Sequence, residues 1–197
     1  MSNIFFKPFV GKNYQTGGIF GKRIMVLGES HHCQHDECPD TTNIVIRRLL
    51  EDKNKETHTS TFIKFERSLI GHHTEAKERN EIWNSVLFYN YLQVAMDGPR
   101  QAGKSADYQN AVPAFYEVLD TYQPEVIIVW GKRLWYALPG DERWQEGEPI
   151  VTEDGQTVET GFYLLSNGNR AKVMAVYHPS TAYSWEKWSE PIRKFIE

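Results

Sequence analysis

The sequence predicts an α/β protein, a three-layer α/β/α sandwich around a central, mostly parallel four-stranded sheet. Two observations support this prediction. Four short runs are almost continuously apolar, as strands covered on both faces of a parallel sheet are. Segments with helical character separate these runs, and such alternation is typical of right-handed crossovers between parallel strands. The runs are Ile24 to Leu27, Val86 to Leu92, Val126 to Trp130 and Lys172 to Tyr177.

The intervening segments predict helices in which apolar residues three or four apart share a face. These are Thr42 to Asp52, Glu75 to Asn84, Asp107 to Tyr122, Lys132 to Leu138 and Trp185 to Ile196. From Pro149 to Asn167, β-prone runs flank Asp154-Gly155, which predicts a hairpin with a two-residue turn. No internal repeat or low-complexity linker is evident, so we expect one domain over residues 1–197.

The composition limits the classes of function. Net charge is -4 and the pI about 6.0, which argues against a protein that coats nucleic acid through bulk charge. Two cysteines cannot build a disulfide framework, and the first residues lack a basic region followed by an apolar run. No stretch approaches 18 apolar residues. We therefore expect a reduced, cytoplasmic monomer that does not enter membranes.

Polar residues follow the predicted strands or, in the case of Asn90, lie within one. They are Gly28-Glu29-Ser30, Asn90, Gly131-Lys132-Arg133 and His178-Pro179-Ser180. In open α/β sheets, ligand sites lie beyond the carboxyl ends of the strands. The sequence thus predicts that a carboxylate, an amide and an imidazole meet at one edge of the sheet.

Taken in order, these four islands resemble the uracil-DNA glycosylase superfamily, most of all its bacterial branches with a Gly-Glu first motif. The resemblance covers roughly residues 22–183 and includes PEVIIVWGKRLWYAL and VYHPS. It implies a uracil-DNA glycosylase-like fold and a hydrolase of base excision repair. Such a DNA glycosylase would cut the N-glycosidic bond of uracil or another deaminated base flipped out of damaged DNA, without a cofactor.

The resemblance also implies roles for individual residues. Glu29 would stabilise the sugar cation or orient water, and His178 would donate a hydrogen bond to the departing base. Asn90 would read the base edge, because one amide offers both donor and acceptor. Ser30 and His32 would complete base recognition.

DNA itself would be held by a few local cations and by the loop after the histidine motif. The residues expected to bind it are Arg100, Lys104, Lys132, Arg133, Ser180 and Tyr183. Arg170 and Lys172 are further cations expected near this edge. Tyr183 or Trp185 stands where the family places a wedge that fills the gap left by the flipped base.

The first motif also departs from the family pattern, which leaves an alternative open. Ser30 stands where the best-known branch has its catalytic aspartate, and His31 replaces the usual proline. A non-catalytic nucleic-acid-binding member of the same fold is therefore the second hypothesis. The iron–sulfur branch needs four cysteines, so no cluster is expected.

Two further motifs carry alternative chemistry. His31, Cys33, His35 and Cys38 are residue types that bind zinc or iron, although Cys-x4-Cys is not a usual zinc spacing, and we expect a polar loop without metal. Gly98 to Ser105 matches the phosphate-loop pattern, in which Lys104 would neutralise phosphates. Nucleotide hydrolysis is the less favoured reading, because the strand ending at Trp130 is followed by Gly131 instead of a magnesium-binding aspartate.

Overall fold

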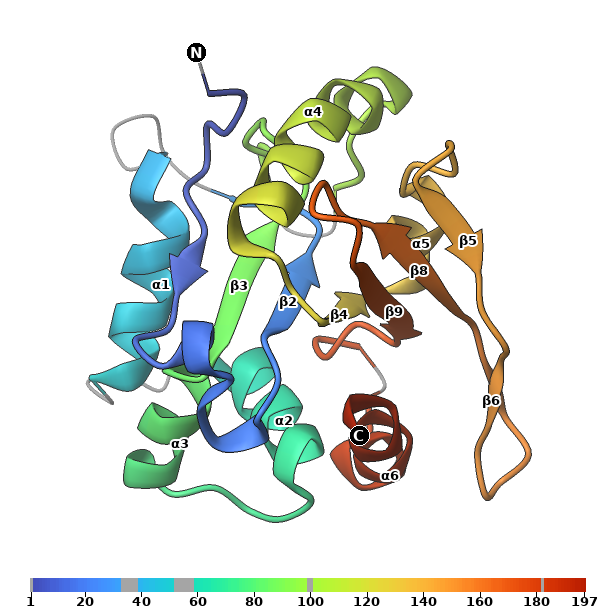
Figure 1. The fold of residues 1–197 in the computed structure, drawn as a ribbon. Coiled ribbons are helices and arrows are strands. Elements are labelled where there is room, and N and C mark those ends of the chain that lie inside the picture. Colours follow the sequence, from blue (N-terminus) through green and yellow to red (C-terminus); the bar gives the residue numbers. More distant parts are fainter. Residues whose placement is uncertain (1, 33–38, 52–58, 99–100, 182) are drawn as a thin grey trace.

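The computed structural model describes residues 2–32, 39–51, 59–98, 101–181 and 183–197. The protein is an α/β protein with a mixed seven-stranded sheet in the order β1-β3-β2-β4-β9-β8-β5, and a separate two-stranded sheet of β6 and β7 (Figure 1). The strands are β1 (Phe9–Val10), β2 (Ile24–Gly28), β3 (Val86–Asn90), β4 (Val126–Trp130), β5 (Trp144–Glu146), β6 (Ile150–Val151), β7 (Thr157–Val158), β8 (Thr160–Leu164) and β9 (Arg170–Val176).

The four predicted strands form the parallel centre of this sheet. β2 pairs in parallel with β3 on one side and β4 on the other, and β4 pairs in parallel with β9. The sequence analysis missed three antiparallel additions: β1 beside β3, β8 beside β9 and β5 beside β8. The expected sheet of four strands is therefore too small. Because β1 and β5 are only two and three residues long, they give little periodicity to detect.

The hairpin predicted between Pro149 and Asn167 exists in part. β6 and β7 form it, and it projects from one side of the main sheet (Figure 1), whereas β8 belongs to that sheet. Its turn differs from the prediction. The Gly155 amide donates to the Thr152 carbonyl, and the Thr152 amide donates to the Gln156 carbonyl, both at 2.9 Å. Gly155 alone has a positive φ here, 79°, so the loop has three residues and ends in a glycine bulge.

Six α-helices are described, five of them within a few residues of their predicted bounds. They are α1 (Thr41–Leu50), α2 (Thr59–Ile70), α3 (Ala76–Trp83), α4 (Ser105–Tyr122), α5 (Lys132–Ala137) and α6 (Trp185–Ile196). Two short 3-10 helices, η1 (Tyr14–Thr16) and η2 (Gly18–Phe20), precede β2. The sequence analysis assigned no helix to α2. In the structure α2 lies beside α6, with Phe62, Phe65 and Leu69 in the core (Figure 1).

The core lies on both faces of the sheet, because neighbouring residues of a strand point to opposite faces. Val26 of β2 belongs to a cluster with side chains of α1, α2, α3 and α6. The next residue, Leu27, belongs to a second cluster with α4 and α5. Every residue of β2, β3 and β4 is buried, which explains why these strands are continuously apolar in the sequence.

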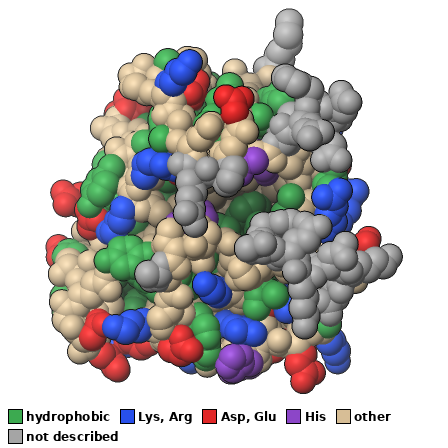
Figure 2. Space-filling view, turned by 180° about the vertical axis from the view of Figure 1, so that it is seen from behind, with side chains coloured by type: hydrophobic (Ala, Val, Ile, Leu, Met, Phe, Trp, Pro, Cys, Tyr) green, Lys and Arg blue, Asp and Glu red, His purple; other side chains and the backbone are tan. Residues whose placement is uncertain are grey.

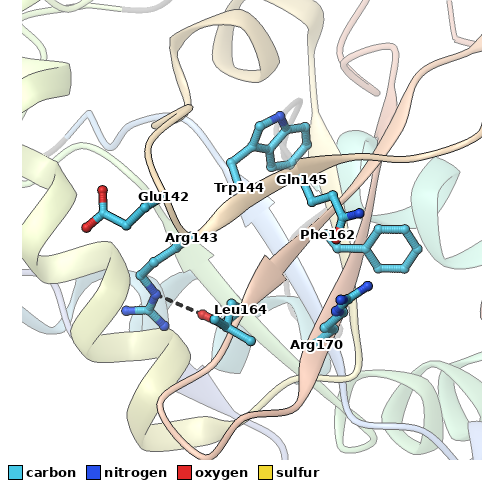
Figure 3. A pocket seen from close by; sticks show the side chains of 7 residues that line it. All are labelled: Glu142, Arg143, Trp144, Gln145, Phe162, Leu164 and Arg170. Atoms are coloured by element: carbon cyan, nitrogen blue, oxygen red, sulfur yellow. Dashed lines mark hydrogen bonds between the residues drawn. The ribbon is translucent and has the colours of Figure 1, made fainter.

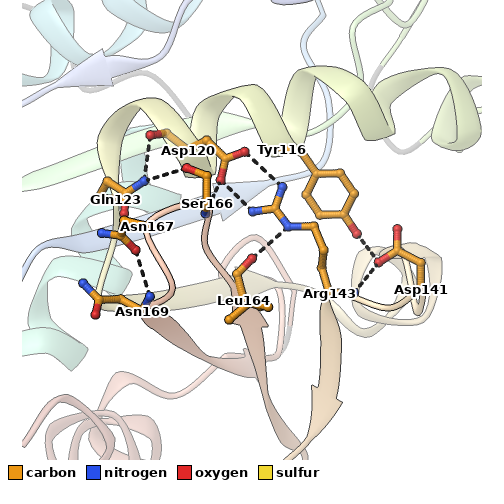
Figure 4. Close-up of polar contacts among 9 residues, drawn as sticks. All are labelled: Tyr116, Asp120, Gln123, Asp141, Arg143, Leu164, Ser166, Asn167 and Asn169. Atoms are coloured by element: carbon orange, nitrogen blue, oxygen red, sulfur yellow. Dashed lines mark hydrogen bonds and ion pairs between the residues drawn. The ribbon is translucent and has the colours of Figure 1, made fainter.

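The short strand β5 is held against α4 by polar contacts (Figure 4). Arg143, just before β5, donates from Nη1 and Nη2 to the carboxylate of Asp120 at 3.1 and 2.6 Å. Its guanidinium also lies 4.2 Å from the ring centre of Tyr116. These contacts offset the weak pairing of a three-residue strand. Among the described residues, no helix is both long and apolar enough to cross a membrane.

Candidate functional site

The structure brings the predicted acid, amide and imidazole to one edge of the sheet. Glu29 follows β2, Asn90 ends β3, and His178 comes two residues after β9. All three strands run in parallel with β4, so their carboxyl ends lie on the same edge. Glu29 and Arg133 both act electrostatically on the pKa of His178, the first raising it and the second lowering it. The side chains of Glu29, Arg133 and His178 are therefore close enough to form one site.

Glu29 is enclosed by Arg133 and Tyr108. Nε of Arg133 lies 2.7 Å from Oε1 and 3.0 Å from Oε2, and Nη2 lies 2.7 Å from Oε2. The Tyr108 hydroxyl, from α4, donates to Oε1. Burial, followed by this hydrogen bond, raises the pKa of Tyr108 to about 12, so the phenol keeps its proton at neutral pH. Both carboxylate oxygens of Glu29 thus have donors before any ligand arrives.

Asn90 is buried and contacts His31. Its amide nitrogen lies 3.1 Å from Nδ1 and 3.0 Å from Nε2 of the His31 ring, and Nε2 lies 2.8 Å from the hydroxyl oxygen of Thr42. Burial, with a smaller effect of His32, lowers the pKa of His31 to about 4, so the ring is neutral at pH 7. A neutral imidazole can accept one hydrogen bond and donate another. Asn90 and Thr42 together satisfy both.

Glycine at position 28 makes room for this amide. Gly28 of β2 pairs with Asn90 of β3, and a Cβ atom at Gly28 would overlap the side-chain oxygen of Asn90. The glycine of the Gly-Glu motif therefore has a steric role in placing Asn90. The amide nitrogen of Asn90 has two N–H groups, so one can stay on His31 while the other, together with the side-chain oxygen, is available to a base edge.

His178 is fixed in one tautomer by its own loop. The Ser180 amide donates to Nδ1 at 3.2 Å, and the Ser180 hydroxyl oxygen lies 2.8 Å from the same nitrogen. Because Nδ1 accepts a hydrogen bond, the proton of the neutral ring is on Nε2. Burial lowers the pKa of His178, which favours the neutral ring. The ring packs edge-on to Trp130 of β4, with centroids 5.9 Å apart. The site thus contains a positioned neutral N–H donor.

The remaining predicted recognition and DNA-binding residues are placed as follows. Ser30 is partly buried and His32 is exposed, next to Glu29 and His31 in the chain. Ser180 is exposed, and Lys104 is exposed at the start of α4. Lys132 forms an ion pair with Glu159 at 2.5 Å. Arg100 lies outside the described residues. Of the predicted DNA-binding cations that are described, Lys132 and Arg133 are therefore both paired with carboxylates.

Tyr183 does not have the position that a wedge requires. It is only 7% exposed, its ring stacks on Trp188 of α6 at 6.1 Å, and its hydroxyl lies 2.7 Å from the Ser68 hydroxyl of α2. Packing of α6 against α2 buries it. Trp185, the second wedge expected from the sequence, is partly buried and packs against His73 at 5.3 Å.

Two of the cations expected near the edge are far from it. Arg170 and Lys172 begin β9, whereas His178 follows the carboxyl end of that strand. Six residues of extended chain separate Arg170 from Val176, about 20 Å. The expectation was wrong because direction along the strand decides the edge, and these residues stand at the amino end.

The metal hypothesis finds no support in the described part of the chain. Cys33, His35 and Cys38 lie outside the described residues, and His31 is engaged by Thr42 and Asn90. Among the residues that are described, no group of three or more His, Cys, Asp or Glu could hold a metal ion.

An acidic side chain stands where a phosphate loop would hold phosphate. The carboxylate of Asp107 accepts a hydrogen bond from the Lys104 amide at 2.7 Å, at the first turn of α4. A phosphate loop needs such amides free for its anionic ligand. Pro99 and Arg100 of the motif lie outside the described residues. The match at Gly98 to Ser105 thus coincides with a capped helix start.

The sequence analysis missed Tyr108, which binds Glu29, and Thr42, which binds His31. Both stand in the first turn of a helix, α4 and α1 respectively. Helices that follow parallel strands begin at the same edge as the strands end, so their first turns were a usable signal.

Two cavities are lined by none of the residues Glu29, Asn90, Arg133 and His178. One, of about 240 Å³, is lined by side chains of β5, β8 and the start of β9, including Arg143 and Arg170 (Figure 3). A second, of about 260 Å³, lies between the β6–β7 hairpin and α6 and is lined in part by Tyr177. The face seen from behind has a hollow with hydrophobic side chains inside it and histidines at its margin (Figure 2).

No protein-family model matches this chain, and no curated protein matches it.

Proposed function

We propose that this protein is a DNA glycosylase of the uracil-DNA glycosylase type. It would hydrolyse the N-glycosidic bond of uracil or another deaminated base that has been flipped out of DNA. The observation that carries the proposal is that His178 and Glu29 lie at the same carboxyl edge of the parallel strands. The imidazole is neutral with its proton on Nε2, and it is close enough to the carboxylate for Glu29 to act on its pKa. The order of the parallel strands and the helices on both faces support a glycosylase-like sandwich.

The two groups suit the two charges that develop in this reaction. As the glycosidic bond breaks, the base becomes an anion and the sugar becomes a cation. The Nε2–H of the neutral His178 ring would donate a hydrogen bond to the oxygen of the base on which negative charge develops. The carboxylate of Glu29 would stabilise the sugar cation or orient the attacking water. Asn90 would read the base edge with its side-chain oxygen and with the N–H that His31 does not accept.

The test is incubation with single- and double-stranded DNA that carries uracil, hypoxanthine or xanthine, followed by alkaline cleavage at abasic sites. We expect strand breaks with at least one of these bases. His178→Ala and Glu29→Gln should each slow excision about a hundredfold, the usual effect of removing one transition-state contact. His72→Ala is the matched control, because His72 is exposed and pairs with Glu78, away from this edge. Intact strands with every base would refute the proposal.

A non-catalytic nucleic-acid-binding protein is the second candidate. It is favoured by the bonds from Arg133 and Tyr108, which occupy both oxygens of Glu29. In this case the protein binds DNA saturably, no abasic product forms, and Glu29→Gln leaves the dissociation constant within about twofold, because a buried carboxylate adds little to phosphate contacts.

A further inference from the structure

The proposed role of Glu29 conflicts with the bonds it makes. Arg133 contacts both carboxylate oxygens, and its positive charge offsets the negative charge that would stabilise a sugar cation. A carboxylate in this state has no oxygen without a donor, and the electric field of its negative charge is weakened by the nearby guanidinium. For Glu29 to act on a sugar, Arg133 has to move away during binding.

The exposure of the two side chains shows which partner can move. The Glu29 side chain is 10% exposed, whereas the Arg133 side chain is 49% exposed. Arg133 is the second residue of α5, which begins directly after Gly131, a residue with a φ of 98°. Its bonds to Glu29 use Nε and Nη2, and a guanidinium carries five N–H donors in all. Arg133 therefore has both solvent access and donors to offer a second anion.

A phosphodiester group of DNA fits the role of this second anion. A guanidinium binds a phosphate with the same fork of N–H groups that binds a carboxylate, so the two anions compete for one donor set. Tyr108 is held on α4 and keeps its bond to Glu29 when Arg133 leaves. Glu29 then retains its position with one donor, and its Oε2 becomes free. The neighbouring Lys132 is paired with Glu159, and its side chain is 28% exposed against 49% for Arg133, which makes Arg133 the more accessible phosphate ligand of the two.

We infer that Arg133 is a positioning residue that exchanges anions. In the free protein it holds Glu29, and when DNA binds it moves to a phosphodiester of the bound strand and releases Glu29 toward the sugar. This inference rests on the proposed function and adds a control on it: the carboxylate becomes active only when a phosphate is in place.

The experiment replaces single phosphates of a short uracil-containing oligonucleotide by uncharged methylphosphonates, one linkage at a time around the target nucleotide. Binding is measured by fluorescence anisotropy and excision by single-turnover kinetics, for the wild type and for Arg133→Gln. At one linkage we expect wild-type binding to weaken about tenfold, the usual effect of losing one charged hydrogen-bonded contact. The same replacement should change binding by Arg133→Gln less than about twofold, because the variant has no cation to lose.

Two further variants keep the test interpretable. Arg170→Gln removes an exposed arginine at the amino end of β9 and is expected to respond to each methylphosphonate as the wild type does. Arg133→Lys keeps the charge without the fork and should retain part of the response, even if Arg133→Gln folds poorly. Circular dichroism checks the fold of each variant.

The outcomes separate this inference from the proposed function. Equal losses in the wild type and Arg133→Gln at every linkage would overturn the partner exchange, while excision of the base would still support a glycosylase. DNA bound without excision of uracil, hypoxanthine or xanthine from matched strands would overturn the release of Glu29 together with the proposed activity. A response confined to one linkage, abolished in Arg133→Gln and accompanied by slower excision of the modified strand, supports the exchange.

Discussion

Two arginine–carboxylate pairs stand at opposite ends of the parallel strands, and they differ in one physical property. Glu66 of α2 and Arg79 of α3 lie near the amino ends, with side chains 0% and 8% exposed. Glu29 and Arg133 lie at the carboxyl ends, and there the arginine is 49% exposed. Each carboxylate also accepts a hydroxyl hydrogen bond, from Thr74 and from Tyr108 respectively.

The enclosed pair has the properties of a structural contact. Nε of Arg79 lies 3.1 and 3.2 Å from the two oxygens of Glu66, and the indole nitrogen of Trp83 donates to Oε2 at 2.9 Å. These bonds fasten α3 to α2. Glu66 is fully buried and Arg79 nearly so, which leaves a ligand little room to compete for the pair. Both pairs consist of an arginine and a glutamate, so residue type does not tell a structural ion pair from an ion pair in a functional site. The exposure of the arginine side chain does.

The largest expected effect tests the enclosed pair. Glu66→Ala leaves the guanidinium of Arg79 buried without its carboxylate, which should lower the free energy of unfolding by about 4 kcal/mol. Urea unfolding followed by circular dichroism measures this. Replacing both partners by Met should cost less than Glu66→Ala, because no charge stays behind. A loss below about 1 kcal/mol in Glu66→Ala would mean that the pair is not the structural contact described here.

The next prediction extends the comparison to the histidines, since His31 is 6% exposed whereas His178 is less enclosed. The pKa of His31 is lowered to about 4 from 6.5, so below pH 6.5 the unfolded chain binds more protons than the folded one. Stability is then lost as the pH falls from about 6.5 to about 4, by up to about 3 kcal/mol.

Urea unfolding at about pH 7 and about pH 4, for the wild type and His31→Gln, isolates this contribution. The variant should show a smaller loss on acidification than the wild type, while His72→Gln, at an exposed histidine, should follow the wild type. Identical losses in all three proteins would contradict the assignment of a buried, neutral His31.

The smallest expected effect tests the accessible pair. Arg133→Gln should lower the free energy of unfolding by only about 1 kcal/mol, because water can replace a half-exposed arginine. Arg143→Gln, whose arginine binds Asp120 and is 20% exposed, provides the matched comparison and should cost more (Figure 4). A loss of more than about 3 kcal/mol in Arg133→Gln would place Arg133 with the enclosed pair and remove the basis for its exchange of partners.

The sequence predicted the centre of this fold well and its edges poorly. β4 has its predicted bounds because all five of its residues, Val126–Trp130, are buried. The edge strands β1 and β5 escaped because two or three residues carry no periodicity. The sequence analysis predicted no helix between α1 and α3 and so missed α2, although Phe62, Phe65 and Leu69 have helical spacing.

The candidate site was predicted in the same uneven way. Glu29, Asn90 and His178 were expected at one edge, and the structure places them there; Asn90, predicted within the run from Val86 to Leu92, proves to be the last residue of β3. Tyr183 was expected at the surface and is buried, because only the packing of α6 on α2 determines which face of that segment meets solvent.

By itself the sequence determined where β2 and β4 end to within one residue, because burial on both faces leaves a continuous apolar run that stops where these strands stop. Only the tertiary structure decided how the residues at the carboxyl edge of the sheet pair. The bonds of Glu29 to Arg133 and Tyr108, and of Asn90 to His31, join segments that are 59 to 104 residues apart in the chain. Such pairings depend on how helices pack against the sheet, and no local pattern in the sequence specifies them.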